Sequence, residues 1–184
     1  MICLINEALK KWEVILSGNR DFNQIVKDNH QKIFGLFMKM VGRHDQADEL
    51  TQRTFVTVYK KLDTFRGESS LDTWIYRIAV NIGKNYLNKK RVKDFVGLDK
   101  IKELIYESSS NINEDSKNYL QQAIQKLPPK QTMVVLLRSF QGLPYKKIGA
   151  ILDISENSAK VNFSHALKNL RKKLNQMGVD YEQL

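Results

Sequence analysis

Apolar residues recur at helical spacing between Leu71 and Tyr86, and this pattern constrains the fold more than any other feature. It predicts one apolar helix face, made of Leu71, Trp74, Ile75, Ile78, Ala79, Ile82 and Tyr86. The opposite face carries cations, amides and a hydroxyl but no acid: Thr73, Arg77, Asn81, Lys84, Asn88 and Arg91. Solvated helix faces normally mix both signs, so this face favours a polyanionic partner. Spacing and charge alone fit an ordinary basic surface helix equally well.

Similar periodicity along the rest of the chain predicts an all-α fold. With three prolines and nine glycines among 184 residues, the sequence holds few helix breakers. We expect Ser17-Gly18-Asn19 to end the first helix, and Gly42 and Gly142 to end two later ones. The expected helices cover residues 7–16, 21–41, 45–62, 71–91, 116–126, 130–140, 144–152 and 155–175.

Residues 92–115 differ in composition from the helices on either side. Acidic side chains outnumber lysines there, and Ser108-Ser109-Ser110-Asn111 is expected to break any helix. The sequence therefore predicts two small helical domains, residues 1–92 and 116–184, joined by a flexible acidic linker over residues 93–115.

Charge and cysteine content narrow the function classes. A formal charge of +10 favours nucleic acid or an anionic membrane surface as partner. Cys3 is the sole cysteine, so the chain can build neither a disulfide framework nor a thiolate zinc site. Apolar runs fall well short of the ~20 residues that span a bilayer, and the N-terminus lacks the order of a signal peptide. We therefore expect a cytoplasmic protein without membrane insertion.

No grouping of side chains indicates catalysis or cofactor binding. His30, His44 and His165 lie far apart in the sequence, which argues against a metal site. The chain has no Ser/His/Asp grouping, glycine-rich phosphate loop or supported carboxylate pair. We expect no metal, no cofactor and no enzyme activity.

The predicted helix over residues 45–62 carries a second candidate surface. Four side chains spaced four, three and four residues apart lie beside its core stripe: Asp48, Gln52, Phe55 and Tyr59. Such a strip is typical of a helix that binds another helix. The alternative is that Phe55 and Tyr59 only widen the core face.

The last two predicted helices, separated by Asp153-Ile154-Ser155, have the layout of a helix-turn-helix. Ala159, Phe163, Ala166, Leu167, Leu170 and Leu174 make the inner face of the second helix. The outer face presents Ser158, Lys160, Val161, Asn162, His165, Lys168, Arg171 and Lys172. This row is expected to enter the major groove of DNA.

Three stretches resemble bacterial alternative sigma factors of the extracytoplasmic-function type. FRGESS followed by TWIYRIAVNIGKNYL resembles the promoter-melting segment, and ADELTQRTFVTVY is similar to the polymerase-docking helix. Leu127-Pro128-Pro129-Lys130-Gln131 with the helix pair resembles the promoter-reading domain. The resemblance spans about residues 21–174 and implies a factor that binds core RNA polymerase, melts −10 DNA and reads the −35 element. The alternative, a stand-alone helix-turn-helix regulator, leaves the first two motifs unexplained.

The resemblance also implies roles for the N-terminal residues. Asp48, Gln52 and Phe55 would meet the clamp helices of the largest polymerase subunit. A flipped base of the −10 element would be held by Arg66, Glu68, Ser69 and Ser70. Phosphates would be held by Arg77, Lys84, Lys89, Lys90 and Arg91, while Asn81 would bond a base or the backbone. Tyr76 could stack on an unpaired base or pack internally.

At the −35 element, the same resemblance implies base contacts from Lys160, Val161, Asn162 and His165. Ser158 completes the expected DNA surface, with phosphate contacts expected from Ser155, Lys160, Lys168, Arg171 and Lys172. The alternative for the last three is a solvated basic helix end. Relatives commonly have arginine at positions 162 and 165 and an acid at 147, where this chain has Lys147. Because asparagine pairs with adenine, we expect an A/T-leaning element. The family also implies an anti-sigma factor, often membrane-anchored.

Overall fold

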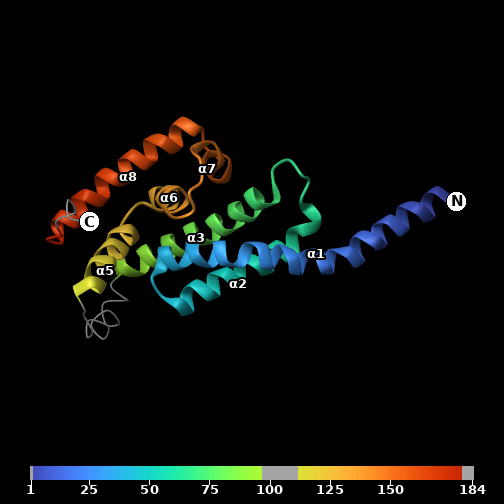
Figure 1. The fold of residues 1–184 in the computed structure, drawn as a ribbon, viewed down its shortest axis with the longest axis horizontal. Helices are drawn as coiled ribbons and strands as arrows, with labels where there is room; N and C mark the ends of the chain where they lie inside the picture. The colour runs from blue at the N-terminus through green and yellow to red at the C-terminus, as the bar shows by residue number, and fades with distance from the viewer. Residues whose placement is uncertain (1, 97–111, 180–184) are drawn as a thin grey trace.

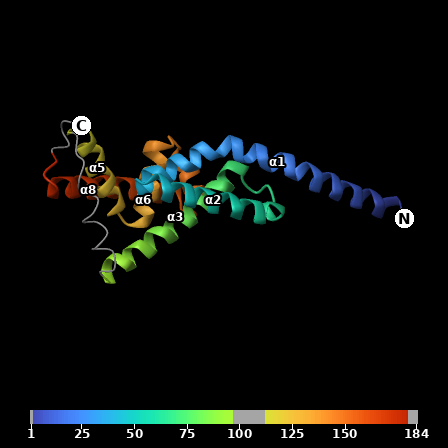
Figure 2. The same cartoon turned by 90° about the horizontal axis from the view of Figure 1, so that it is seen from below.

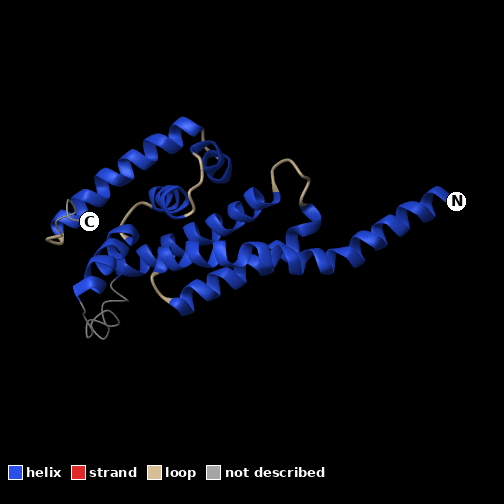
Figure 3. Cartoon of the chain, in the orientation of Figure 1, coloured by secondary structure: helices blue, strands red, loops and turns tan. Residues whose placement is uncertain are grey.

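The computed structural model describes residues 2–96 and 112–179, with side chains placed for residues 22–92 and 119–179. Within those ranges it contains helices and no strands, which confirms the all-α prediction (Figure 3). The order along the chain is α1 (Ile2–Val41), α2 (His44–Lys61), the 3-10 turn η1 (Leu62–Thr64), α3 (Leu71–Val96), α5 (Ile112–Gln125), α6 (Pro129–Val135), the π-helical η2 (Leu136–Phe140), α7 (Tyr145–Leu152) and α8 (Glu156–Gln176).

One continuous helix replaces the two helices predicted at the N-terminus. α1 is 40 residues long and runs through Ser17-Gly18-Asn19, so the predicted break there is wrong. No proline stands in this stretch, and a glycine inside a helix costs only about 1 kcal/mol relative to alanine. The first part of α1 projects beyond the helices that pack on its second part (Figures 1 and 2).

The predicted linker is shorter than its composition indicated. α3 continues to Val96 and α5 already begins at Ile112, so both ends of the predicted 93–115 segment are helical. The expected helix-breaking run at 108–111 lies outside the described residues.

The second part of α1 packs with α2 and α3 as an N-terminal unit. Its core holds Ile33, Leu36, Phe37 and Met40 from α1, Leu50 and Val58 from α2, and Ile75 and Ala79 from α3. The buried Thr51 and Thr54 hydroxyls donate to the carbonyls of Ala47 and Leu50, at 2.7 and 2.8 Å, so neither is left unpaired. Gly42, with φ of 75°, ends α1 and turns the chain into α2.

The C-terminal unit is built around α6, η2, α7 and α8, with α5 packed against α8. The structure confirms the helix-turn-helix. α7 ends at Asp153 in the left-handed region (φ 56°), and the Ser155 hydroxyl accepts a hydrogen bond from the Ser158 amide at 3.0 Å to begin α8. A Cβ on Gly149 would lie 2.7 Å from the Ile154 carbonyl oxygen, so the turn passes close to α7.

The two units pack directly on each other and share one apolar core. α3 lies against α6 and α7, while α1 lies against α5 and η2 (Figures 1 and 2). Gly83 of α3 marks the closest approach, since a Cβ there would lie 2.6 Å from the Met133 Cε atom of α6. The contacts therefore hold the polar face of α3 next to the helix-turn-helix.

Candidate polymerase and DNA interfaces

The outer strip of α2 is exposed and combines amide, carboxylate and apolar groups. The Gln52 side chain donates to a carboxylate oxygen of Asp48 at 2.8 Å. Tyr59 is 60% exposed, and its ring meets that of Phe22 edge-on at 5.0 Å. Val56, which the sequence analysis did not single out, is 52% exposed. It stands one helical turn after Gln52, so the same spacing rule could have found it.

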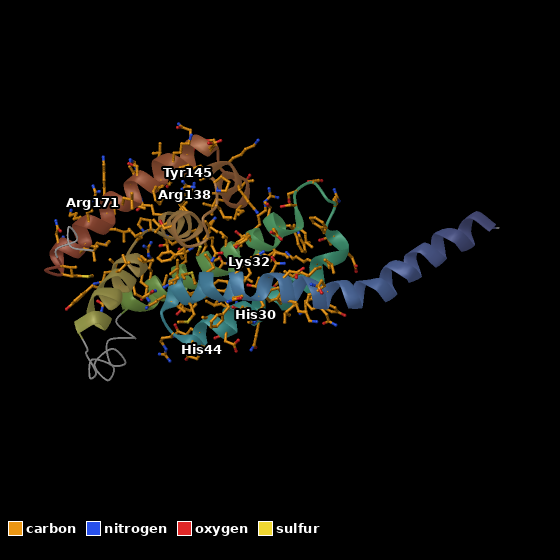
Figure 4. The ribbon with its side chains drawn as sticks, viewed as in Figure 1. His30, Lys32, His44, Arg138, Tyr145 and Arg171 are labelled. Carbon is orange, nitrogen blue, oxygen red and sulfur yellow. The ribbon has the colours of Figure 1, made fainter. Side chains whose placement is uncertain are left out.

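Phe55 lies in the core of the N-terminal unit, beside that strip. It is 7% exposed, and its ring stacks with the imidazole of His30 at 6.1 Å between centroids. His30 and His44 both lie on the α1–α2 side of the molecule (Figure 4). The α2 surface consequently presents Asp48, Gln52, Val56 and Tyr59, while Phe55 supports it from beneath.

The loop before α3 leaves two of its four predicted base-pocket residues fully available. Arg66 and Glu68 are exposed, and neither forms a hydrogen bond or ion pair within the described residues. The Ser70 hydroxyl accepts from the Thr73 amide at 3.3 Å and so caps α3, while the Ser69 hydroxyl donates to the Ser70 carbonyl at 3.4 Å. Gly67 provides the turn, with φ of 73°.

Much of the polar face of α3 is bonded to the C-terminal unit. The Arg77 guanidinium donates to the Ala150 carbonyl oxygen at 2.9 Å, and the Lys90 ammonium donates to the Gln125 side chain at 3.0 Å. The Arg91 guanidinium donates to the Leu127 carbonyl. Lys89 and Asn81 stay exposed. The structure thus places five of the predicted −10 cations on α3, where Arg77, Lys84 and Lys90 are half-buried while Lys89 and Arg91 stay exposed.

Tyr76 packs internally. It is 3% exposed, and its hydroxyl donates to the Gln141 side-chain oxygen at 2.9 Å. Burial, with a smaller contribution from the Asp72 carboxylate, raises the pKa of Tyr76 to about 12. Of its two predicted roles, the structure shows internal packing, so base stacking would require this contact to open.

A groove of about 820 Å³ separates α3 from the C-terminal unit. Its α3 side is lined by Arg77, Asn81, Lys84 and Asn88, and its far side by Pro129, Lys130, Ile151, Leu152, Asp153 and Ile154. Partial burial, reinforced by the neighbouring Lys130 ammonium and opposed by Asp153, lowers the pKa of Lys84. The charged groups that line the groove are three cations, Arg77, Lys84 and Lys130, and one carboxylate, Asp153.

The outer face of α8 is open to solvent along its length. The exposed side chains are Lys160, Val161, His165, Lys168, Arg171 and Lys172, of which Figure 4 labels Arg171. Lys160 pairs with Glu156 at 3.1 Å. The half-buried Asn162 donates its amide to the Ser158 carbonyl at 2.7 Å. This arrangement can enter a major groove without rearranging the helix backbone.

Two further features bear on function class. Among residues 2–96 and 112–179, no helix combines the length and apolar character needed to cross a bilayer. In the same ranges, no three His, Cys, Asp or Glu side chains gather as metal ligands would.

Comparison with known proteins gives matches across both units. Residues 25–92 match the family model of sigma-70 region 2, and residues 117–170 match that of sigma-70, region 4. The ECF RNA polymerase sigma-E factor of Salmonella typhimurium is 32% identical over 144 residues, which cover 72% of this chain and 75% of that protein. The RNA polymerase sigma-H factor of Pseudomonas aeruginosa is 28% identical over 167 residues, or 84% and 86% of the two chains.

Solved structures show the same fold. CnrH, in complex with the cytosolic domain of CnrY, aligns with a TM-score of 0.63 at 17% identity, covering 86% of this chain and 90% of CnrH. The sigma factor RpoE of Bartonella quintana, in complex with the anti-sigma factor NepR, aligns with a TM-score of 0.61 at 20% identity, covering 85% and 98%. With region 2 and region 4 matched in order and a sigma-E relative at 32% identity, this chain belongs to the ECF family of alternative sigma factors, which direct RNA polymerase to initiate transcription.

Proposed function

We propose that this sigma factor works through three surfaces on separate helices. The outer strip of α2 binds core polymerase, the loop 65–70 with the polar face of α3 holds the melted −10 strand, and the outer face of α8 reads the −35 duplex. The observation that carries the proposal is the exposed Asp48–Gln52 pair beside Val56 and Tyr59, because a stand-alone DNA-binding regulator has no use for such a strip.

The docking surface is proposed to contact the clamp helices of the largest polymerase subunit. Gln52 and Asp48 supply hydrogen bonds that fix the register, and Val56 and Tyr59 supply apolar area worth about 25 cal/mol for each Å² buried. Phe55 acts by holding α2 in place, since its ring is already covered.

In the −10 region, Arg66 and Glu68 are the strongest candidates to bond the edge of an extruded base, because neither has another partner among the described residues. Ser69 and Ser70 contribute hydroxyls from the same turn. Arg77, Lys84, Lys89, Lys90 and Arg91 are proposed to hold phosphates, which would make strand binding strongly salt-dependent. Asn81 is exposed and free to bond a base or the backbone.

In the −35 region, Lys160, Val161, Asn162 and His165 are proposed to face base edges. Asn162 must release the Ser158 carbonyl to read adenine with both groups of its amide. The expected phosphate contacts come from Ser155, Ser158, Lys168 and Arg171. Because the N-terminal and C-terminal units belong to one chain, their combined affinity for a promoter exceeds that of either unit, provided that both contact the −10 and −35 elements at the same time.

The chain is also proposed to be controlled by an anti-sigma factor. The Bartonella RpoE structure is a complex with such a factor, NepR, and its fold is shared over most of this chain. An inhibitor anchored in the membrane would hold the sigma factor at the cytoplasmic face until released. We expect this chain to act in the cytoplasm, where the polymerase works.

Run-off transcription with purified core polymerase tests the proposal. Adding the chain should create specific starts on a promoter library, and Gln52→Ala should weaken core binding by roughly tenfold, which corresponds to the ~1.4 kcal/mol of a hydrogen bond to a charged group. Gln24→Ala is the matched control, because Gln24 forms the same exposed amide-to-carboxylate pair with Asp28 on α1, at 2.7 Å. Absence of specific starts, or equal loss in both variants, would contradict the docking assignment.

A further inference from the structure

The first turn of α8 carries an asparagine that has no role in the proposed −35 surface. Asn157 is exposed, and its side chain forms no hydrogen bond or ion pair within the described residues. We propose that Asn157 reads an adenine of the −35 element, and that Val161, one turn further along α8, contacts the methyl group of a neighbouring thymine. This inference deepens the proposed function and rests on it, since it requires α8 to enter the major groove.

The other polar side chains of this first turn are already bonded. The Glu156 carboxylate pairs with the Lys160 ammonium at 3.1 Å. The Ser158 hydroxyl accepts a hydrogen bond from the Ser155 hydroxyl at 2.8 Å. The recognition helix of a helix-turn-helix contacts base edges with its N-terminal residues. Asn157 is therefore the polar side chain of this turn that can bond a base without giving up another partner.

The two asparagines near the start of α8 differ in what their amides already bond. An asparagine reads adenine with both groups of its amide, because the oxygen accepts from N6 and the nitrogen donates to N7. Asn162 is half-buried, and its amide nitrogen donates to the Ser158 carbonyl at 2.7 Å. Asn162 would lose this bond on binding adenine, whereas Asn157 exchanges only water. The structure consequently favours Asn157 as the adenine reader.

Val161 lies in the same row of the helix surface as Asn157. Asn157, Val161 and His165 are spaced four residues apart, so they follow one another along one face of α8. Val161 is 44% exposed, although it is apolar. Thymine is the base that presents an apolar group in the major groove, its C5 methyl. Contact between this methyl group and Val161 would remove apolar surface of both from water.

The spacing of the two side chains sets the spacing of the two bases. Four residues of an α-helix advance about 6 Å along its axis. Successive bases of one DNA strand are about 3.4 Å apart along the duplex. The adenine and the thymine are therefore expected one or two base pairs apart in the −35 element.

Selection by the reconstituted holoenzyme from a promoter library with a randomised −35 element tests the assignment. Asn157→Ala should lower the preference for adenine at one position roughly tenfold, because it removes a bidentate contact. Asn162→Ala should keep that preference. Asn175→Ala is the matched control, because Asn175 is an exposed asparagine in the last turn of α8. Thermal melting of each variant checks that the chain stays folded.

Modified bases in the selected promoter identify the contacting atoms. Replacing the adenine by 7-deazaadenine removes the N7 acceptor, and should weaken holoenzyme binding roughly tenfold for the unmodified protein but not for Asn157→Ala. Replacing the thymine by uracil removes the methyl group. This should weaken binding of the unmodified protein roughly fourfold, the effect of one buried methyl group, and that of Val161→Ala much less. All affinities are measured at one salt concentration, because phosphate contacts make them salt-dependent.

Three results would overturn the inference. They are a loss of adenine preference in Asn162→Ala but not in Asn157→Ala, equal weakening by 7-deazaadenine with and without Asn157, and equal weakening by uracil with and without Val161. A specific −35 motif that Asn157→Ala leaves unaltered would remove the inference while the sigma-factor function stands. If the unmodified chain gives no specific starts with core polymerase, the proposed function fails and the inference falls with it.

Discussion

α3 and α8 both carry a row of cations and amides, yet the fold treats the two rows differently. On α3, the Arg77 guanidinium donates a hydrogen bond to the Ala150 carbonyl oxygen, and Lys84 is partly buried beside Lys130. On α8, Lys160, His165 and Lys168 face solvent. Similar local chemistry therefore yields one partly buried surface and one open surface, and the difference comes from what packs on each helix.

The functions proposed for the two faces place different demands on the structure. The proposed duplex reading uses the open face of α8 and requires no domain movement. The proposed strand binding uses α3, which contacts α6 and α7.

Removing core volume from the C-terminal unit should abolish the difference between the faces. Leu137→Ala deletes a fully buried side chain of η2 and should lower the free energy of unfolding by about 2–5 kcal/mol, measured by urea denaturation. Amides of α3 should then exchange faster with deuterium. Leu167→Ala on α8, where the side chain is 37% exposed, is the control and should change stability by about 0.5 kcal/mol or less. Unchanged deuterium exchange of the α3 amides in Leu137→Ala would contradict the packing of the C-terminal unit on α3.

Adding a bidentate donor to the open face should change what it reads. His165→Arg should favour guanine at one position of the −35 element, because arginine pairs with two acceptors of guanine, with a discrimination of about 1–3 kcal/mol. Selection from a randomised −35 library by the reconstituted holoenzyme measures this preference. His44→Arg adds the same group to α2 and should leave the selection unaltered. An identical selected motif for all three proteins would show that the reading row lies elsewhere.

Two glycine substitutions should separate helix propensity from interface packing. Gly35→Ala adds a methyl group where no atom lies within 4 Å, so we expect up to about 1 kcal/mol of stabilisation. Gly83→Ala adds the same group 2.6 Å from Met133 Cε, and the methionine must move, which should cancel most of that gain. Thermal unfolding of the two variants should show a higher midpoint for the first. Equal midpoints would contradict the close contact between Gly83 of α3 and Met133 of α6.

High pH should loosen the contact between α3 and the C-terminal unit. Burial raises the folded-state pKa of Tyr76 to about 12 from an ordinary value of 10, so the neutral phenol is favoured by folding. Its stabilising contribution is complete below pH 10 and is lost as the pH rises through about 12. A phenolate can no longer donate to Gln141, so the units should separate in that window. The absorbance of tyrosinate should change together with the distance between spin labels at Lys60→Cys on α2 and Ser164→Cys on α8, measured in a Cys3→Ser background.

Tyr76→Phe is the control for this pH effect. It removes both the titration and the hydroxyl bond while keeping the ring that fills the core. In this variant, the distance between the same two spin labels should lose most of its pH dependence between pH 10 and 12. A change of the same size in both proteins would assign the effect to other groups.

Much of the architecture follows from local pattern. Apolar spacing predicted the helical course of α2, α3, α7 and α8, and the short run 153–155 predicted the turn of the helix-turn-helix, which Ser155 caps as expected of a serine. These features depend on residues within a few turns of one another, so the sequence carries them directly. The break expected at Gly18 was wrong because an isolated glycine lowers helix stability without forbidding the helix.

Which candidate side chains are exposed depends on contacts between distant parts of the chain. For Phe55 and Tyr76 the sequence left a binding role and a buried role open, and in the structure one is stacked against His30 and the other is bonded to Gln141. The covering of α3 arises from pairs such as Arg77 with Ala150, which lie 73 residues apart and leave no periodic signal. The helices and the chemistry of their faces could be predicted from the sequence, because backbone hydrogen bonding and amphipathic spacing are local. The burial of a given face could not, because it depends on which distant segments pack against it.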